Sequence, residues 1–324
     1  MNNINPNDIE TITVLKGTAA SSLYGSLAKN GAIIITTKRG KAGKLHVDYS
    51  GSANFSRVGK LPDYQSEFGQ GWGGLWVPDE NGSWGPKLDG QIRPWGAVVN
   101  GVQQMKPFSF IKNNVRDFYA TGSEYNNNLA LSGGTETNRF YFSYGNVTSQ
   151  GVIPGPVDRQ QRNTFSLRTN SNWGRFAINS SFNFVTQALT VPNTGQSTAS
   201  GGGTFENLLQ IPVDLPISSF KNYNGPYNNN SYYFTPYAEN PYFDIYENGD
   251  QQNLNRLFGN IDLNYKFTDA LSAEFRLGGD FTDARTFIWK QLASAHAGTW
   301  DGPDPTNPEG QSKTPDIGQV SQGS

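Results

Sequence analysis

The sequence contains no cysteine and only two histidines among its 324 residues. The absence of cysteine excludes disulfides, thiolate catalysis and cysteine-based zinc sites. His46 and His296 lie far apart and neither has a second histidine at metal-binding spacing, so we expect no metal site. The chain carries 25 basic and 27 acidic side chains without a basic cluster, which argues against nucleic acid as a partner.

Catalytic motifs are also missing. The chain has no GxSxG elbow and no GxxxxGK[ST] phosphate loop. Two pairs of carboxylates, Asp79/Glu80 and Asp301/Asp304, lie in loops rich in glycine and proline, where such pairs are usually solvated surface. We therefore expect neither an enzyme nor a bound cofactor.

Long apolar runs are absent as well. No stretch approaches the ~20 apolar residues of a membrane-spanning helix. No signal peptide is visible, and the chain opens and closes on loop-like sequence, so we expect a fragment of a longer protein. Aromatic residues, at 13%, and 37 glycines are plentiful instead. This combination favours β-structure with long polar loops over a helical core.

Residues 1–43 are typical of a small α/β unit. The sequence predicts a strand, a short helix and a second strand, over residues 11–17, 18–25 and 32–40. The second strand begins with Ala32-Ile33-Ile34-Ile35, the most apolar short run in the chain. Because a strand that is apolar on both sides is usually covered on both sides, we expect this strand to be doubly buried.

After residue 44, apolar and polar residues alternate in about seven segments, several of them about 10–14 residues long. The segment at 175–186 places Phe182 and Phe184 on one face and Ser181 and Asn183 on the other. Such strands exceed the ~5–6 residues of an average strand and are long enough to cross a bilayer. We expect their apolar faces to meet lipid and their polar faces to meet water.

The connections between these strands alternate in length. Short turns follow the second, fourth and sixth strands, whereas long loops follow the first, fifth and seventh, at 57–124, 189–253 and 286–324. This alternation is typical of an outer-membrane β-barrel, although hairpins of a soluble β-protein remain an alternative. Five aromatic residues are predicted near strand ends, where they suit interfacial girdles: Tyr49, Tyr144, Trp173, Tyr265 and Phe267.

The segment INPNDIETITVLKGTAASSLYGSLAKNGAIIITTKRGK, residues 4–41, closely resembles the C-terminal half of the plug domain in SusC/RagA-family TonB-dependent outer-membrane transporters. It departs from the family pattern at Leu27 and Lys29. SWGPKLDG at 83–90, the hairpin at 126–154 and the strand at 162–170 also resemble the family. The residues that carry the plug motif are Asp8, Glu10, Leu15, Lys16, Tyr24, Gly25, Asn30, Gly31, Thr36 and Thr37.

The resemblance implies a mainly β fold. It would be a partial transmembrane antiparallel β-barrel, about seven of roughly 22 strands, preceded by part of a small α/β plug domain. The plug part would cover residues 1–43 and the barrel part residues 44–324, with the three long loops on the outside. About seven strands cannot close such a barrel, so the resemblance also implies that a signal sequence and a TonB-contacting segment lie upstream.

In function, the resemblance implies TonB-dependent active uptake of a nutrient across the bacterial outer membrane. The solute would be an oligosaccharide or a peptide, with a glycan favoured, and a SusD-like surface lipoprotein would be the partner. A secreted or surface glycan-binding or adhesion module without transport is the alternative. That alternative explains the loops rich in asparagine and aromatic residues, but it does not explain residues 4–41.

Aromatic residues crowd the first two long loops. Flat rings stack on sugar faces while neighbouring amides bind hydroxyl groups, so these rings are candidates for substrate contact. The alternative is that they pack the loops against each other and against the lipoprotein. The candidate residues are Trp72, Trp76, Trp84, Trp95, Tyr232 and Tyr233.

Three basic residues, Lys38, Arg39 and Lys41, lie at the end of the α/β unit. One interpretation is that they form salt bridges with carboxylates on the polar faces of the strands and so hold the plug. An equally favoured interpretation is ordinary surface charge. The candidate carboxylates are Asp262, Glu274 and Asp280.

Overall fold

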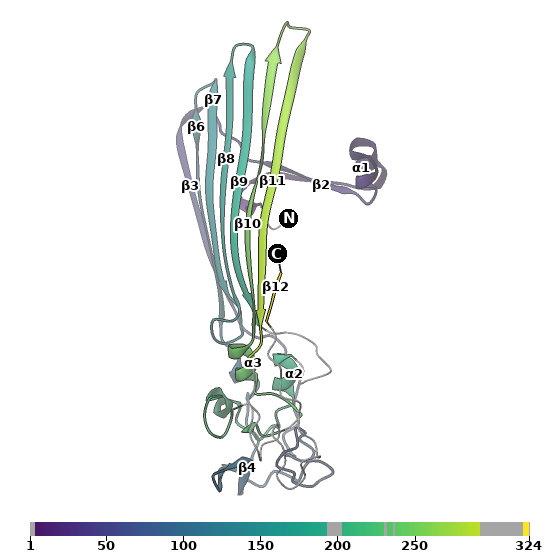
Figure 1. The fold of residues 1–324 in the computed structure, drawn as a ribbon, viewed down its shortest axis with the longest axis vertical. Coiled ribbons are helices and arrows are strands. Elements are labelled where there is room, and N and C mark those ends of the chain that lie inside the picture. The colour runs from purple at the N-terminus through teal and green to yellow at the C-terminus, as the bar shows by residue number, and fades with distance from the viewer. Residues whose placement is uncertain (1–3, 193–202, 230–231, 236, 292–319, 324) are drawn as a thin grey trace.

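The computed structural model describes residues 4–192, 203–229, 232–235, 237–291 and 320–323. It has three parts: a tall curved sheet, a side arm that leaves the sheet at mid-height, and a domain of loops at one end (Figure 1). We call this the long-loop end of the sheet and the opposite end the short-turn end. No helix within these described ranges is both long and apolar enough to cross a membrane.

The sheet is antiparallel, and its eight strands lie side by side in the order in which they occur in the chain. Its seven long strands are those predicted from the alternation. The eighth, β12, is short and lies inside the segment predicted as a loop. The strands are β3 (Gly43–Ser56), β6 (Gly122–Gly134), β7 (Asn138–Gln150), β8 (Arg159–Trp173), β9 (Phe176–Val191), β10 (Gly249–Lys266), β11 (Ser272–Trp289) and β12 (Val320–Gly323).

Strands β9, β10 and β11 are longer at the long-loop end than predicted. Asp250 pairs with Val191, and Gly249 pairs with Trp289, so the ladder continues past the predicted boundaries. Backbone hydrogen bonding does not require apolar side chains, and here it continues into polar sequence. The strands therefore project beyond their own apolar segments.

One face of the sheet carries a continuous row of large apolar side chains. The pairing register aligns one such residue from each long strand, and the rings on β7, β8 and β9 pack with centroids 4.9 and 6.3 Å apart. We call this the outer apolar row. Its members are Tyr49, Leu129, Tyr144, Phe165, Phe184, Leu257 and Phe281.

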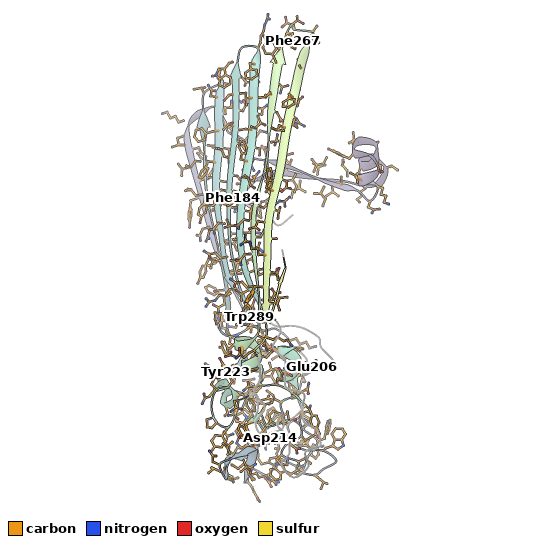
Figure 2. The ribbon with its side chains drawn as sticks, in the orientation of Figure 1. Phe184, Glu206, Asp214, Tyr223, Phe267 and Trp289 are labelled. Carbon is orange, nitrogen blue, oxygen red and sulfur yellow. The ribbon has the colours of Figure 1, made fainter. Side chains whose placement is uncertain are left out.

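A second aromatic row lies near the short-turn end of the same face. Trp173 stacks on Phe176 at 6.3 Å, and Tyr265 is the partner of Phe176 on β10. Figure 2 shows Phe267 at the short-turn end and Phe184 near mid-height. The rows are eight residues apart on β8, about 27 Å along a strand or roughly 20 Å along the normal after the usual tilt. This separation is comparable to the apolar band of a membrane barrel.

The prediction that Tyr49 and Tyr144 lie near strand ends is wrong. Tyr49 lies midway along β3 and Tyr144 midway along β7. Both belong to the outer apolar row and so still mark one edge of the apolar band. The strands run on for several residues beyond that edge, which is why position along the strand was misleading.

The side arm, residues 4–42, contains the predicted strand, helix and strand. Asn5 caps the first turn and Pro6 follows it, as the Asn-Pro pair favours. Gly31 adopts φ 107°, and a side chain there would meet the Leu15 carbonyl at 2.9 Å, so this turn requires glycine. The arm consists of η1 (Pro6–Asp8), β1 (Ile9–Leu15), α1 (Gly17–Tyr24), η2 (Gly25–Ala28) and β2 (Ala32–Thr37).

The expectation that the Ala32–Ile35 run is doubly buried is not met within the described residues. Ile33 is 49% exposed, and Leu27 on the adjoining turn is 97% exposed. Strand β2 pairs antiparallel with β1 and with no other described strand, and α1 lies at the tip of the arm rather than over it (Figure 1). The arm thus presents an uncovered apolar surface.

The first two long loops fold together into one loop domain. Trp95, Val115 and Phe118 from the first loop share a core with residues of the second, including Leu215 and Phe220. The sequence predicts only long loops for these segments, whereas the structure shows short strands and helices in them. These are β4 (Ile92–Val99), β5 (Val102–Pro107), η3 (Arg116–Phe118), α2 (Thr204–Leu209), η4 (Ile217–Lys221) and α3 (Pro241–Glu247).

We expect Trp95→Ala in the full-length protein to destabilise the loop domain by about 3–5 kcal/mol, because it removes a buried ring at the contact between the two loops. Limited proteolysis should then cut both loops faster. Trp84→Ala, which removes an exposed ring from the first loop, is the matched control. Equal protease resistance of the Trp95 variant and the wild type would contradict a shared core.

Candidate functional site

The side arm joins the sheet through one buried carboxylate. Asp8 is fully buried and accepts hydrogen bonds from the Tyr141 hydroxyl at 2.9 Å and the Ser143 hydroxyl at 2.8 Å. The Arg168 guanidinium lies 3.9 Å from the same carboxylate and over the Tyr141 ring, with 5.4 Å to its centroid. A carboxylate removed from water needs such partners, so Asp8 fixes the arm to the inner face of β7 and β8.

Two glycines allow the chain to approach the sheet this closely. The Asn5 amide donates to Asn128 Oδ1 on β6 at 2.7 Å. A side chain on Gly145 would meet the Asn5 amide at 2.5 Å, and one on Gly40 would meet the Phe140 carbonyl oxygen at 2.4 Å. Both ends of the arm therefore pass close to the sheet at a glycine: Gly145 on the sheet at the first end and Gly40 on the arm at the second.

Of the two interpretations of the basic residues at the end of the arm, the structure favours surface charge, because Lys38, Arg39 and Lys41 are all exposed. Lys38, Arg39 and Lys41 form no salt bridge with the three candidate carboxylates, which instead pair with arginines of β10 and β11, two of them across the two strands. Asp262 and Glu274 pair with Arg276, and Asp280 pairs with Arg256. The charged contact that does join the arm to the sheet has the opposite arrangement, with the acid, Asp8, on the arm and the arginine, Arg168, on the sheet.

A cleft of about 540 Å³ lies between the arm and the inner face of the sheet. Ile4 and Thr37 line it from the arm side. The sheet side offers small and polar residues, two charges and one aromatic ring: Arg168, Ser181, Asn183, Phe258, Gly259, Asn260, Gly278, Gly279 and Asp280. This lining suits water and polar solutes rather than lipid.

A buried ion pair organises the loop domain. Lys106 donates from its amino group to Asp214, and both side chains are buried. The other carboxylate oxygen of Asp214 accepts the Gln70 backbone N–H at 2.7 Å. Burial lowers the pKa of Lys106, and the negative charge of Asp214 opposes that change. Because Asp214 comes from the second loop, the pair joins the two loops. Figure 2 shows Asp214 within the loop domain.

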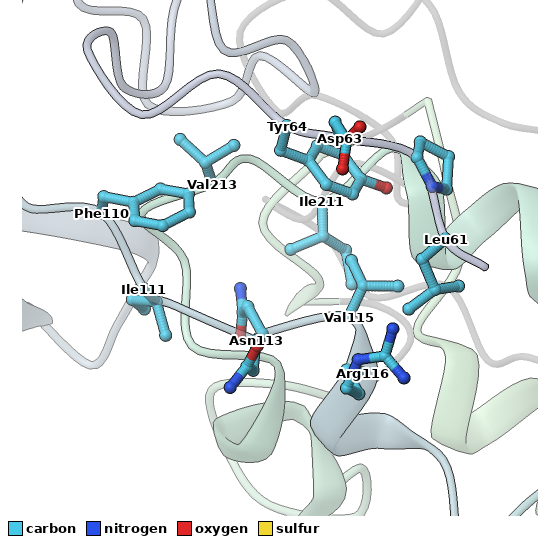
Figure 3. A pocket seen from close by; sticks show the side chains of 12 residues that line it. Leu61, Asp63, Tyr64, Phe110, Ile111, Asn113, Val115, Arg116, Ile211 and Val213 are labelled. Atoms are coloured by element: carbon cyan, nitrogen blue, oxygen red, sulfur yellow. The ribbon is translucent and has the colours of Figure 1, made fainter. Parts of the chain in front are cut away.

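Figure 3 shows a cavity of about 240 Å³ in the loop domain. Leu61 and Tyr64 border it on one side and Val115 on another, while Ile211 and Val213 come from the second loop. Burial raises the pKa of Tyr64, whose hydroxyl has no hydrogen-bond partner among the described residues. This cavity is not predictable from the sequence, because no motif marks the segments that line it.

The six aromatic candidates fall into three groups. Trp72 and Trp84 are exposed, at 63% and 59%, and Trp76 and Tyr232 are half-buried. Trp95 and Tyr233 are buried, with exposures of 3% and 1%, in the core shared by the loops.

For the two buried residues, this placement favours the packing alternative. The Phe220 ring lies 5.8 Å from Trp95 and 5.0 Å from Tyr233 by centroid distance. Burial also raises the pKa of Tyr233 well above its usual value. Substrate contact by the other four residues stays a prediction.

The two exposed tryptophans belong to one rigid turn structure. The Trp84 N–H donates to the Gly71 carbonyl at 3.0 Å, and the Gly74 N–H donates to the Trp84 carbonyl at 2.9 Å. Trp72 is held by exchange of backbone hydrogen bonds with Leu75. The rings are therefore presented from an ordered backbone, which lowers the entropic cost of binding.

The remaining sequence-predicted residues lie as follows. Among the motif residues, Asp8 forms the junction, Thr37 borders the inner cleft, and Glu10 and Tyr24 are exposed. Of the paired carboxylates, Glu80 accepts a hydrogen bond from the Asn81 N–H at 3.1 Å. Asp301, Asp304 and His296 lie outside the described residues.

Curated relatives cover most of this chain. TonB-dependent receptor SusC of Bacteroides thetaiotaomicron is 27% identical over an alignment of 299 residues, which covers 86% of this chain and 27% of the relative. TonB-dependent receptor P39 of Formosa agariphila is 28% identical over an alignment of 290 residues, which covers 87% of this chain and 25% of the relative. The chain thus spans about a quarter of the length of these relatives. No family model matches it.

The solved structures that resemble the chain carry the same fold. The RagAB peptide importer in its open-open state aligns with a TM-score of 0.57 at 17% identity, covering 89% of this chain and 33% of that chain. The RagAB peptide transporter gives the same TM-score over 94% of this chain and 35% of the other. The resemblance to the SusC/RagA family and its outer-membrane location are thereby confirmed, as is the partial antiparallel barrel.

We expect Asp8→Ala in the full-length protein to weaken the junction by about 3–5 kcal/mol, because Arg168 would stay buried without its acid. Trypsin should then reach residues 29–41 faster in outer-membrane preparations. Glu10→Ala, an exposed acid two residues further along the same arm, is the matched control. Equal cleavage rates for the Asp8 and Glu10 variants would show that the junction does not depend on the buried carboxylate.

We expect Lys106→Met to destabilise the loop domain by about 3–5 kcal/mol, since Asp214 would lose its cation at a fully buried position. The double variant Lys106→Met/Asp214→Leu should recover much of this loss, because it leaves no buried charge unpaired. Thermal unfolding monitored by hydrogen exchange in the loops measures both effects. Lys112→Met, on an exposed lysine of the same loop, is the control and should change little.

Proposed function

We propose that this chain, as part of a SusC/RagA-family TonB-dependent receptor, contributes to active uptake of a polar nutrient across the bacterial outer membrane. The observation that carries the proposal is the junction at Asp8, where an arm with the plug motif is fixed to the inner face of a membrane-type sheet. A plug held inside a barrel is the arrangement that a gated transporter needs. An adhesion module without transport does not need a plug held in this way.

The two faces of the sheet support this proposal. The outer face carries the outer apolar row and the aromatic row near the short-turn end, at a spacing comparable to the apolar band of a membrane barrel. The inner face carries arginines, carboxylates and amides. The cleft beside the arm is lined on the sheet side by such polar groups. We infer that solutes pass along this wet inner face and that no covalent chemistry takes place there.

We propose a glycan as the transported solute. Trp72 and Trp84 are presented at the surface of the loop domain, and flat apolar rings beside amides are what sugar binding uses. A peptide is the second candidate, because the two similar solved structures are described as a peptide importer and a peptide transporter. Peptide binding would depend less on ring stacking and more on backbone hydrogen bonds.

We further propose two protein partners. TonB would supply energy through a segment upstream of this chain. A SusD-like surface lipoprotein would lie against the loop domain, which forms the whole long-loop end of the described structure (Figure 1). Its exposed apolar residues, including Phe68 near the two tryptophans, would be shared between solute and lipoprotein.

We expect Trp72→Ala and Trp84→Ala each to reduce oligosaccharide uptake by the full-length receptor about ten-fold, as stacking is worth on the order of 1 kcal/mol or more. Growth on defined oligosaccharides or peptides as sole carbon source, with radiolabelled uptake, is the measurement. Leu75→Ala controls for loss of apolar surface in the same turn, and Trp72→Tyr should retain most uptake. Reduced peptide uptake with unchanged oligosaccharide uptake would favour the second candidate.

A further inference from the structure

The outer face of the sheet changes from apolar to polar within a single step of the register. Immediately beyond the outer apolar row, toward the long-loop end, every long strand carries a residue without an apolar side chain. On β3 this residue is Gly51. On the other six strands it forms what we call the polar row: Asn127, Asn146, Asn163, Thr186, Asn255 and Asp283.

Hydrogen bonds connect the polar row across the strands. Asn146 donates from its amide to Asn163 Oδ1 at 2.8 Å, and Asn163 donates to the Thr186 hydroxyl at 3.5 Å. The Tyr144 hydroxyl donates to the same Asn163 oxygen at 2.9 Å, from a ring in the outer apolar row. The tyrosine thus has its ring among apolar neighbours and its hydroxyl in the polar row, as tyrosines do at a membrane interface.

This arrangement fixes one edge of the hydrocarbon layer. Amides without water or a polar partner are costly in hydrocarbon, whereas the rings of the outer apolar row gain by meeting it. The edge is sharpest on β7, β8, β9 and β10, where no large apolar side chain follows the polar row on this face. The polar row is on the long-loop side of that edge, which in a barrel of this class faces the exterior, and so it lies among lipid headgroups of the outer leaflet.

The chemistry of the polar row selects among headgroups. Five of its six side chains are uncharged amides or hydroxyls, the sixth is an aspartate, and none is a lysine or arginine. A surface that bound a headgroup through its phosphates would supply cations, so this row suits the sugars of a headgroup rather than its phosphates. Amides with two N–H donors and one carbonyl acceptor instead match the hydroxyl groups of a sugar. Asn146, Asn163 and Thr186 are half-exposed, so a headgroup can reach them.

We propose that the polar row on β6–β9 binds the sugar headgroup of a glycolipid in the outer leaflet. The acyl chains of that lipid pack on the outer apolar row below, with Phe165 and Phe184 under the bound sugar. This surface is separate from the solute path on the inner face. The proposal depends on the outer-membrane location and is independent of which nutrient is transported.

The first experiment measures binding of lipopolysaccharide to the full-length receptor purified in detergent, with phosphatidylcholine as the comparison lipid. We expect Asn146→Ala/Asn163→Ala to weaken lipopolysaccharide binding about five-fold or more, because two donors are lost. Phosphatidylcholine binding should be unchanged. Asn260→Ala, an asparagine on the inner face of β10, is the matched control and should bind both lipids like the wild type.

Two outcomes of this experiment would overturn the proposal. The first is unchanged lipopolysaccharide affinity in the double variant. The second is an equal loss of affinity for both lipids, which would mean that the row contacts headgroups without preference for sugar. Because uptake is not the readout, either failure is distinguishable from failure of the transport proposal.

A second experiment does not require the double variant to fold. Single nitroxide labels are attached at Phe184→Cys and Thr186→Cys in bilayers of phosphatidylcholine, with and without lipopolysaccharide. We expect the label at 184 to be shielded from a water-soluble paramagnetic reagent in both bilayers. The label at 186 should be accessible in phosphatidylcholine and become shielded when lipopolysaccharide is present. Equal accessibility at 186 in the two bilayers would overturn the proposal.

Discussion

Backbone hydrogen bonding is the constraint on which the rest of this structure depends. A chain that crosses a bilayer must satisfy every backbone N–H and C=O within the protein, and long antiparallel strands in sequence order do so with short turns at one end. The period of two that follows assigns alternate side chains to lipid and to water. The two aromatic rows, the wet inner face and the cleft beside the arm all result from that alternation.

The arm is held against this regular sheet by an irregular contact. The Asp8 carboxylate has hydroxyl partners on β7 and a guanidinium nearby on β8, and glycines clear its approach. The loop domain repeats the principle, since the buried pair of Lys106 and Asp214 joins segments far apart in the chain. In both places a desolvated charge is tolerated only with its partners in position, which makes the contact specific rather than merely adhesive.

Much of the sheet could be predicted from the sequence, because the alternation of apolar and polar residues is a local signal. Strand geometry imposes it on residues such as Phe182 and Phe184. The arm was recognisable from its motif. Its attachment was not, since the partner hydroxyl of Asp8 lies 133 residues away and no local pattern links the two. The burial of Trp95 and Tyr233 was equally inaccessible, because the core of the loop domain has no periodicity and forms only when two loops meet.

The shared core of the two loops has a consequence for how these two segments can change during evolution. Loops of membrane barrels are often regarded as independent insertions that vary freely. Here the segment between β3 and β6 and the segment between β9 and β10 stabilise each other, through Trp95 packed on Phe220 and Lys106 paired with Asp214. Exchange of one loop alone would leave a buried ring without its packing partner and a buried charge without its counter-ion. A substitution in one segment is therefore constrained by the residues that it contacts in the other.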